Sequence, residues 1–116
     1  MAAALAQRRW SGCKIQSAGI SVLSAGQGAA YEAAAAMRRR GIDIGAHKTT
    51  SIGDVDIHSF AYIVAMDGAV PHVLHAKGVN PSKVREALVD DPIGRDAQQY
   101  EACACAIEAK LDALVF

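Results

Sequence analysis

Several classes of protein need features that this 116-residue chain lacks. Its 12 lysines and arginines are matched by 12 aspartates and glutamates, so the formal net charge is zero, whereas a nucleic-acid-binding domain normally presents a basic face. Its apolar runs, of which Ala61 to Met66 is the cleanest, fall far short of the roughly 20 residues that cross a bilayer. We therefore expect neither nucleic acid nor a membrane as a partner.

Cysteine is also scarce. The chain has three cysteines, an odd number without the spacing of a disulfide framework or a metal site. Near the N-terminus, Arg8 and Arg9 follow a short apolar stretch, which is the reverse of the order in a secretory signal. This pattern predicts a reduced, cytoplasmic protein.

What the chain does contain is typical of one folded domain. Hydrophobic residues make up 52% and charged residues 21%, a balance that argues against disorder. A length of 116 residues is that of a single domain of ordinary size. We therefore expect residues 1–116 to form one domain.

Strand-like and helix-like segments alternate along this domain. Phe60 to Met66 is continuously apolar, which predicts a strand buried on both faces and hence a parallel sheet. Gly41 is expected to end the helix before it. This alternation predicts an α/β fold with a mainly parallel sheet. The other predicted elements are strands at 13–18 and 83–89, helices at 1–10, 29–40, 69–77 and from 95 or 96 to about 114, and a short helical segment at 52–58.

The cysteines are the first candidates for a catalytic nucleophile. A cysteine phosphatase needs a Cys-x5-Arg loop, whose main-chain N–H groups hold the phosphate and lower the thiol pKa. None of Cys13, Cys103 and Cys105 is followed by an arginine six positions later. We therefore expect all three to be small apolar residues of the structure.

Two weaker candidates are a metal site and a phosphate loop. His72 and His75 are three positions apart on a predicted helix and could share a face, but no third ligand with convincing spacing accompanies them. Gly26 and Gly28 precede a predicted helix, although a lone Gly-x-Gly is more often a flexible turn than an anion site. We expect no metal and no cofactor.

Two adjacent carboxylates, Asp90 and Asp91, stand before Pro92. Proline disfavours the helical region for the residue before it, which can hold the Asp91 carboxylate outward over a site. From the residues alone, an acid–base role and a simple turn or helix start both remain open.

Taken in order, short motifs along nearly the whole chain resemble the low-molecular-weight protein tyrosine phosphatase family. They are Met1-Ala2-Ala3 with its helix, Ser17-Ala18-Gly19 after a strand, Arg40-Gly41-Ile42-Asp43 followed by His47, Ile63-Val64-Ala65-Met66-Asp67, Asp91-Pro92-Ile93-Gly94 and an acidic terminal helix. The resemblance implies a three-layer sandwich in which helices flank a mainly parallel sheet. It also implies hydrolysis of a phosphate monoester, on a phosphorylated protein or a small ester, through a cysteinyl-phosphate.

The resemblance assigns roles to two residues. Asp91 matches the family's general acid, which protonates the leaving oxygen and then activates water. Ile93 stands where the family commonly has an aromatic residue in the wall of the substrate pocket, and an aliphatic side chain cannot stack on a phenyl ring. Relatives that act on phosphoarginine or reduce arsenate share the fold, so the substrate stays open.

One part of the family pattern is missing. The family's nucleophilic Cys-x5-Arg-Ser loop directly precedes Pro-Met-Ala, and this sequence begins at the corresponding Met1. We expect the family's first strand, its nucleophile and its phosphate-binding arginine to be absent from this chain, and the chain as it stands to be inactive. Three explanations stay open: a start upstream of Met1, a non-catalytic pseudophosphatase that acts as a binding module, and a homodimer in which a second copy completes the sheet.

Overall fold

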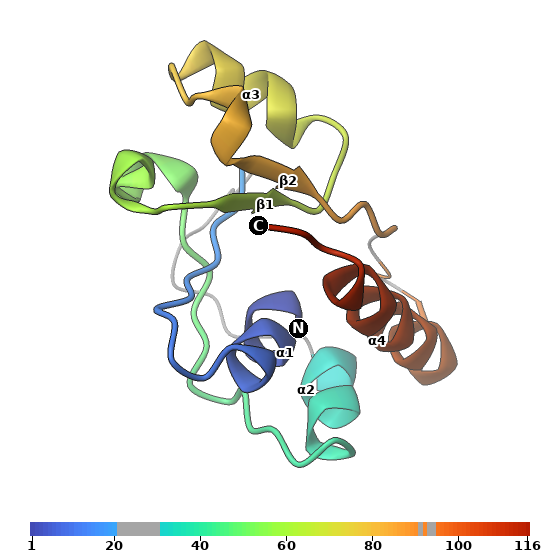
Figure 1. Ribbon diagram of the computed structural model, residues 1–116. Helices are drawn as coiled ribbons and strands as arrows, with labels where there is room; N and C mark the ends of the chain where they lie inside the picture. Colours follow the sequence, from blue (N-terminus) through green and yellow to red (C-terminus); the bar gives the residue numbers. More distant parts are fainter. Residues whose placement is uncertain (21–30, 91, 93–94) are drawn as a thin grey trace.

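Two parallel strands lie between two groups of helices (Figure 1). The computed structural model describes residues 1–20, 31–90, 92 and 95–116. Helices α1, α2 and α4 lie on one side of the strands, and α3 lies on the other, which confirms the expected α/β class. In chain order the elements are α1 (Ala2–Arg9), α2 (Tyr31–Arg38), η1 (Ile52–Asp54), η2 (Ile57–Ser59), β1 (Ile63–Ala65), α3 (Val70–Ala76), η3 (Pro81–Lys83), β2 (Val84–Glu86) and α4 (Ala97–Asp112), where η marks a short 3-10 helix.

The sheet is a parallel pair in which Ala65 of β1 lies opposite Glu86 of β2. Parallel strands need a crossover connection between them, and α3 lies in that connection. Main-chain pairing continues beyond β2, since the Ala87 N–H donates to the Ala65 carbonyl at 2.8 Å and the Val89 N–H donates to the Met66 carbonyl at 3.2 Å. Both predicted segments therefore contain a strand, and the second remains bonded to the first up to Val89, its predicted end. The first strand is shorter than predicted, since it covers only Ile63–Ala65 and the preceding Ala61 and Tyr62 are exposed rather than buried.

The predicted strand at 13–18 is wrong. The chain instead makes an isolated parallel bridge between Gly19 and Ser51, in which the Gly19 N–H donates to the Thr50 carbonyl at 2.9 Å. Of residues 13–18 only Ile15 is half-buried, and the others are exposed. One apolar side chain is too small a face to hold a segment in a sheet, because strand stability depends mainly on side-chain packing. The short helical segment expected at 52–58 consists of the two 3-10 turns η1 and η2.

The main core lies among the three helices on one side of the strands. Ala36, Met37 and Ala104 are completely buried in it. Because alanine has a small side chain, α2 and α4 can pack closely along their alanine-rich faces. The other buried members of this core are Leu5, Ala6, Ala33, Tyr100, Cys103, Ile107 and Leu111. A smaller core on the other side of the strands consists of Ile57, Leu74 and Val79.

A glycine ends each of two helices. Gly41 follows α2 with a φ of 75°, and Gly78 follows α3 with a φ of 79°. A side chain is strained in this left-handed region, which glycine adopts freely. After α2 the Ile42 N–H turns back to the Met37 carbonyl at 2.9 Å. The expected helix stop at Gly41 is confirmed.

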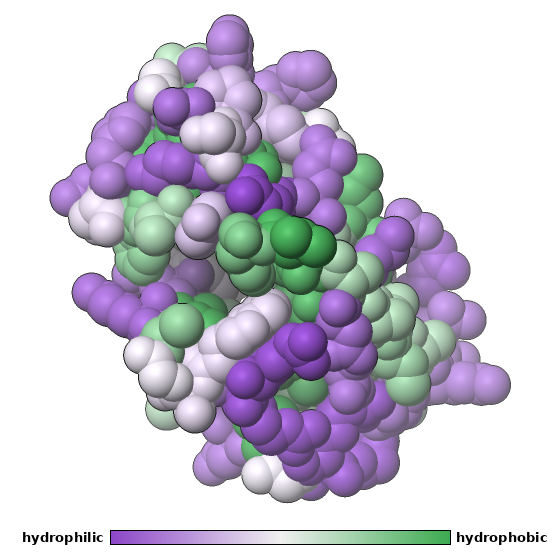
Figure 2. All heavy atoms as spheres, viewed as in Figure 1, coloured by the Kyte–Doolittle hydropathy of each residue, from purple (hydrophilic) through white to green (hydrophobic). Residues whose placement is uncertain are grey.

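The C-terminal tail joins the helical side to the strands. The Phe116 ring packs edge-on against Trp10, at the end of α1, and against Tyr62, just before β1, with ring centroids 5.5 and 4.9 Å apart. Val115 and Phe116 are nevertheless exposed, and Figure 2 shows an apolar patch near the centre of an otherwise mostly hydrophilic face. In the ranges that the structure describes, no helix is both long and apolar enough to span a membrane.

Candidate active site

The chain leaves the sheet at the carboxyl end of β2 through Leu88, Val89 and Asp90. The bond from the Val89 N–H to the Met66 carbonyl fixes this exit beside the carboxyl end of β1. In α/β proteins with open parallel sheets, ligands bind outside the carboxyl ends of the strands. The candidate site is therefore at this edge of the sheet.

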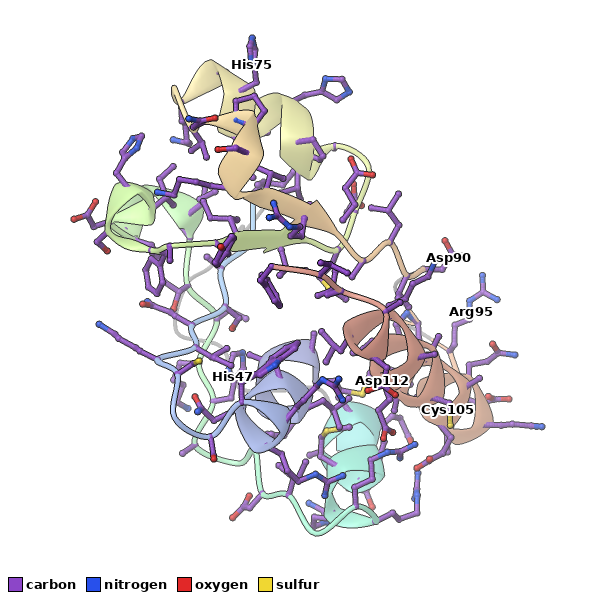
Figure 3. The ribbon with its side chains drawn as sticks, viewed as in Figure 1. His47, His75, Asp90, Arg95, Cys105 and Asp112 are labelled. Atoms are coloured by element: carbon purple, nitrogen blue, oxygen red, sulfur yellow. The ribbon has the colours of Figure 1, made fainter. Side chains whose placement is uncertain are left out.

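A hollow of about 620 Å³ lies between this exit segment and α4. The Arg95 N–H donates to the Pro92 carbonyl at 2.9 Å, and Asp96 caps α4 by accepting from the Gln99 N–H at 2.9 Å. These two bonds join the segment to the first turn of α4. Figure 3 shows Asp90 and Arg95 on the same edge of the molecule, directed outward. The lining residues are Leu88, Val89, Asp90, Pro92, Arg95, Gln99, Ala102, Cys103 and Ala106.

Cys103 supports the floor of the hollow from α4. Its side chain is buried, and its Sγ–H donates to the Asp90 carbonyl with an Sγ–O distance of 3.7 Å. A buried thiol that is already engaged in this way holds the main chain at Asp90 in place. Cys103 is thus a structural residue, as expected.

The start of α1 reaches the same end of the molecule. Met1 packs against the main core together with Met66 and Val89. Burial lowers the pKa of the Met1 amino group below its ordinary value, and the nearby Cys103 side chain opposes this shift. The first turn of α1 contains no acidic residue, and no side chain among the described residues caps it. Its main-chain N–H groups therefore form the positive end of a helix dipole, where an anion is favoured.

The two residues to which the resemblance assigned roles, Asp91 and Ile93, lie outside the described residues. Gly26 and Gly28 of the weak phosphate-loop candidate also lie outside them. The structure describes the neighbours Asp90 and Pro92 and brings both to the hollow.

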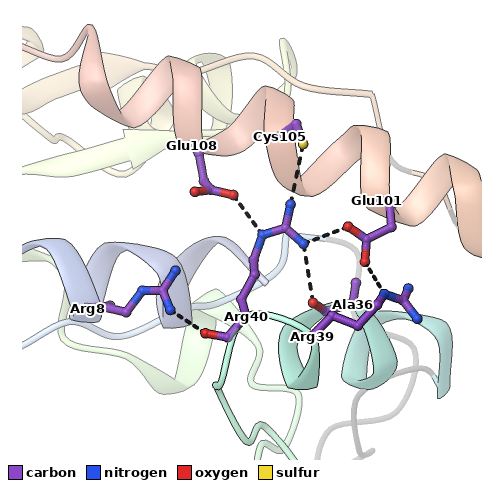
Figure 4. Close-up of polar contacts among 7 residues, drawn as sticks. All are labelled: Arg8, Ala36, Arg39, Arg40, Glu101, Cys105 and Glu108. Atoms are coloured by element: carbon purple, nitrogen blue, oxygen red, sulfur yellow. Dashed lines mark hydrogen bonds and ion pairs between the residues drawn. The ribbon is translucent and has the colours of Figure 1, made fainter.

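The other two cysteines differ from the expectation that they are small apolar residues of the structure. Cys13 and Cys105 are both exposed. Cys105 Sγ lies 3.4 Å from Arg40 Nη2, at the edge of an ion-pair cluster between α2 and α4 (Figure 4). Neither residue lines the hollow.

The two histidines do not form a metal site with other described residues. His72 and His75 are exposed on α3 and do not line the hollow, and Figure 3 shows His75 well away from Asp90 and Arg95. Within the described ranges, no group of three or more histidine, cysteine, aspartate or glutamate side chains is placed to hold a metal ion.

Arg95 and Gln99, which line the hollow with Asp90 and Pro92, were not predicted as site residues from the sequence. Their spacing could have indicated a shared position, because residues four apart at the start of a predicted helix lie on one face. The contact between Cys103 and Asp90 was not predicted either, because the two residues are 13 positions apart and the local sequence gives no signal for it.

Several solved structures are similar to this one. The arginine phosphatase YwlE from Geobacillus stearothermophilus superposes with a TM-score of 0.82 at 21% identity, over 96% of this chain and 78% of that one. The low-molecular-weight protein tyrosine phosphatase from T. tengcongensis gives 0.83 at 22% identity, over 96% and 84%. Wzb from Vibrio vulnificus, in complex with benzylphosphonate, gives 0.82 at 15% identity, over 97% and 84%. At these identities the likeness establishes the fold.

The comparison of sequences establishes the family. No curated protein matches the chain significantly. The family model described as low molecular weight phosphotyrosine protein phosphatase, however, matches residues 1–115, which is almost the entire chain. The chain belongs to the low-molecular-weight phosphotyrosine protein phosphatase family.

Proposed function

We propose that this chain is a phosphatase-type domain that takes a phosphorylated protein or a small phosphate ester at the carboxyl end of its strands, with Asp91 as the general acid. The observation that carries the proposal is that Asp90 and Pro92, on either side of that aspartate in the sequence, line the hollow beside α4. The positive end of α1 reaches the same end of the molecule. The structurally similar Wzb binds benzylphosphonate, a phosphate-like anion.

The proposed chemistry divides phosphate transfer into two steps. A thiolate attacks phosphorus, the bond from phosphorus to the leaving oxygen breaks, and Asp91 gives its proton to that oxygen. The Asp91 carboxylate then takes a proton from the water that hydrolyses the cysteinyl-phosphate. In this proposal Ile93 supplies an aliphatic wall of the pocket. Such a wall does not favour an aromatic substrate group over an aliphatic group of similar size. Phosphotyrosine and phosphoarginine therefore both stay within the proposed substrate class. With phosphoarginine the bond that breaks is the one from phosphorus to nitrogen, and Asp91 gives its proton to that guanidino nitrogen.

These 116 residues lack a cysteine followed six positions later by arginine. Cys103 is buried, and the exposed Cys13 and Cys105 do not line the hollow. We therefore propose that the chain as it stands binds without turnover, because it carries the general acid without the nucleophile.

The proposal extends to the full three-layer sandwich of the family. Among the described residues β1 pairs only with β2, although Ala65 at its end is completely buried. A strand with an unpaired edge is open to a further strand. We propose that a longer form of the chain, or a second copy in a homodimer, supplies it. A cooperatively folded monomer in sedimentation experiments would remove the need for the homodimer.

Hydrolysis of p-nitrophenyl phosphate tests the proposed role of Asp91. The chain should be prolonged upstream with a strand and a Cys-x5-Arg-Ser loop, which supply the nucleophile. We expect the prolonged chain to be active and Asp91→Asn to lower its kcat about 100-fold, since general acid catalysis contributes about 10² or more. Asp56→Asn, which changes an exposed aspartate before η2, serves as the control and should leave kcat unchanged.

Two results would contradict the proposal. An unchanged kcat after Asp91→Asn would remove that residue from the mechanism. Thiol-dependent hydrolysis by the 116-residue chain itself would show that one of its own cysteines is a nucleophile after all.

A further inference from the structure

Arg95 presents an unpaired cation at the hollow. It is exposed and lines the hollow next to the start of α4, and within the described part of the chain its guanidinium has no hydrogen bond or ion pair. Most other arginines are engaged: Arg9 pairs with Asp112, Arg39 with Glu101, and Arg85 donates to the Val115 carbonyl. A free guanidinium at the edge of a concave site is available to a carboxylate of a ligand.

The α4 wall of the hollow consists of Gln99 and the small side chains Ala102, Cys103 and Ala106. Arg95 lies just before the N-cap of α4, and Gln99 and the exposed alanines Ala102 and Ala106 lie along one face of the helix that lines the hollow. On the opposite wall Leu88 is 43% exposed. A volume of about 620 Å³ falls in the range of ligand sites, roughly 300–1,000 Å³. The hollow therefore offers room for an apolar side chain next to the cation.

The main chain beside the hollow has a free edge. Ala87 and Val89 direct their N–H groups to the carbonyls of β1. Because successive residues of an extended chain direct their N–H groups to opposite edges, Leu88 between them faces away from β1. Within the described residues, the main chain of Leu88 makes no hydrogen bond. An extended peptide passing this edge can pair with it, as in recognition by strand addition.

We infer that the hollow is a docking groove for an extended peptide segment next to the phosphorylated residue of a protein substrate, and that Arg95 selects an acidic side chain in that segment. Asp90 and Pro92 line the groove together with residues of α4, so it is continuous with the proposed active site, and the inference rests on the proposed function. Leu88, Ala102 and Ala106 contact an apolar side chain of the peptide. Asp90 also lines the groove, where its carboxylate disfavours an acidic side chain placed against it, while Asp96 is already engaged in capping α4.

Peptide binding to the 116-residue chain tests this inference without any need for turnover. The probes are two fluorescein-labelled phosphotyrosine peptides that differ only in carrying glutamate or lysine next to an apolar residue in the flank, and their two unphosphorylated counterparts. Fluorescence anisotropy gives the Kd of each peptide. We expect the chain to bind the glutamate peptide about fivefold more tightly than the lysine peptide, as for one exposed ion pair, and Arg95→Glu to reverse the preference.

Arg38→Glu is the matched control. Arg38 is an exposed arginine at the end of α2, outside the hollow, and it likewise has no side-chain partner in the described ranges. This substitution changes the net charge by the same amount as Arg95→Glu, so it should keep the wild-type preference. If both variants have the same Tm as the wild-type chain, both are folded.

The peptide pairs separate this inference from the proposed function. A glutamate preference that is lost with Arg95→Glu and is the same with and without phosphate supports the groove and contradicts a phosphate site in this chain. A preference unaffected by Arg95→Glu, or lost equally with Arg38→Glu, overturns the role of Arg95. If the chain binds neither the glutamate peptides nor the lysine peptides, the docking groove is overturned.

Discussion

Arg40 Nη1 and Glu101 Oε2 lie 2.7 Å apart and connect the end of α2 to α4 (Figure 4). The same guanidinium donates through Nε to Glu108 at 2.7 Å and through Nη1 to the Ala36 carbonyl at 3.3 Å. The Arg40 side chain is only 15% exposed, so this cluster is more shielded from water than an ordinary surface ion pair. The hydrogen bonds to Glu101 and Glu108 raise the pKa of Arg40.

Replacing this arginine should therefore reduce stability. Arg40→Met leaves two carboxylates without their partner, but both remain partly exposed to water. We expect a loss of about 1–2 kcal/mol in the free energy of unfolding, in the range for charged hydrogen bonds. Urea denaturation measures it, with Arg38→Met as the control that removes an arginine outside the cluster. Equal losses for both variants would show that the cluster adds nothing.

The same cluster should make stability depend on pH in the acid range. Hydrogen bonds from Arg40 and then Arg39 lower the pKa of Glu101 below its ordinary value. A carboxyl group whose pKa is lower in the folded than in the unfolded chain stabilises the fold above its unfolded pKa, and this contribution is lost as the pH falls through the folded pKa. We expect Glu101→Gln to flatten the decrease of Tm between about pH 5 and about pH 3. A decrease as steep as in the wild type would contradict the contribution of Glu101.

Met37 should be among the most sensitive positions of the main core. It is completely buried against α1 and α4, so Met37→Ala creates a cavity in addition to losing apolar contact. We expect a loss of about 2–5 kcal/mol by urea denaturation. Tyr31→Ala, at a side chain that is 76% exposed on the same helix, should cost much less. Similar losses for the two variants would contradict the packing described for α2.

The C-terminal tail offers a test with an internal probe. Trp10 is the chain's one tryptophan, and Phe116 contacts its ring. We expect Phe116→Ala to shift the tryptophan emission to longer wavelength and to lower stability by about 1 kcal/mol, the order of an aromatic pair. Val115→Ala, at a neighbouring side chain that is 78% exposed, should change neither. An unshifted emission after Phe116→Ala would show that the tail does not cover Trp10 in solution.

Local patterns in the sequence are enough to determine the order and type of most elements and the family. The apolar segment from Phe60 to Met66 contains β1, Gly41 follows α2 as its stop, and the terminal helix covers 97–112. These features depend on neighbouring residues, through side-chain periodicity and the conformational freedom of glycine. The family follows in the same way from the order of short motifs, which needs no knowledge of contacts.

The features that local patterns do not predict depend on contacts between segments that are distant in the sequence. Residues 13–18 alternate like a strand, yet they lie outside the sheet because strand pairing needs a partner edge and an apolar face to bury. The bond between Cys103 and Asp90, the hollow beside Arg95 and the position of Arg40 between two glutamates join residues that the sequence keeps apart. Their geometry depends on how α2, α4 and the end of β2 pack together, since packing brings side chains from separate segments within bonding distance.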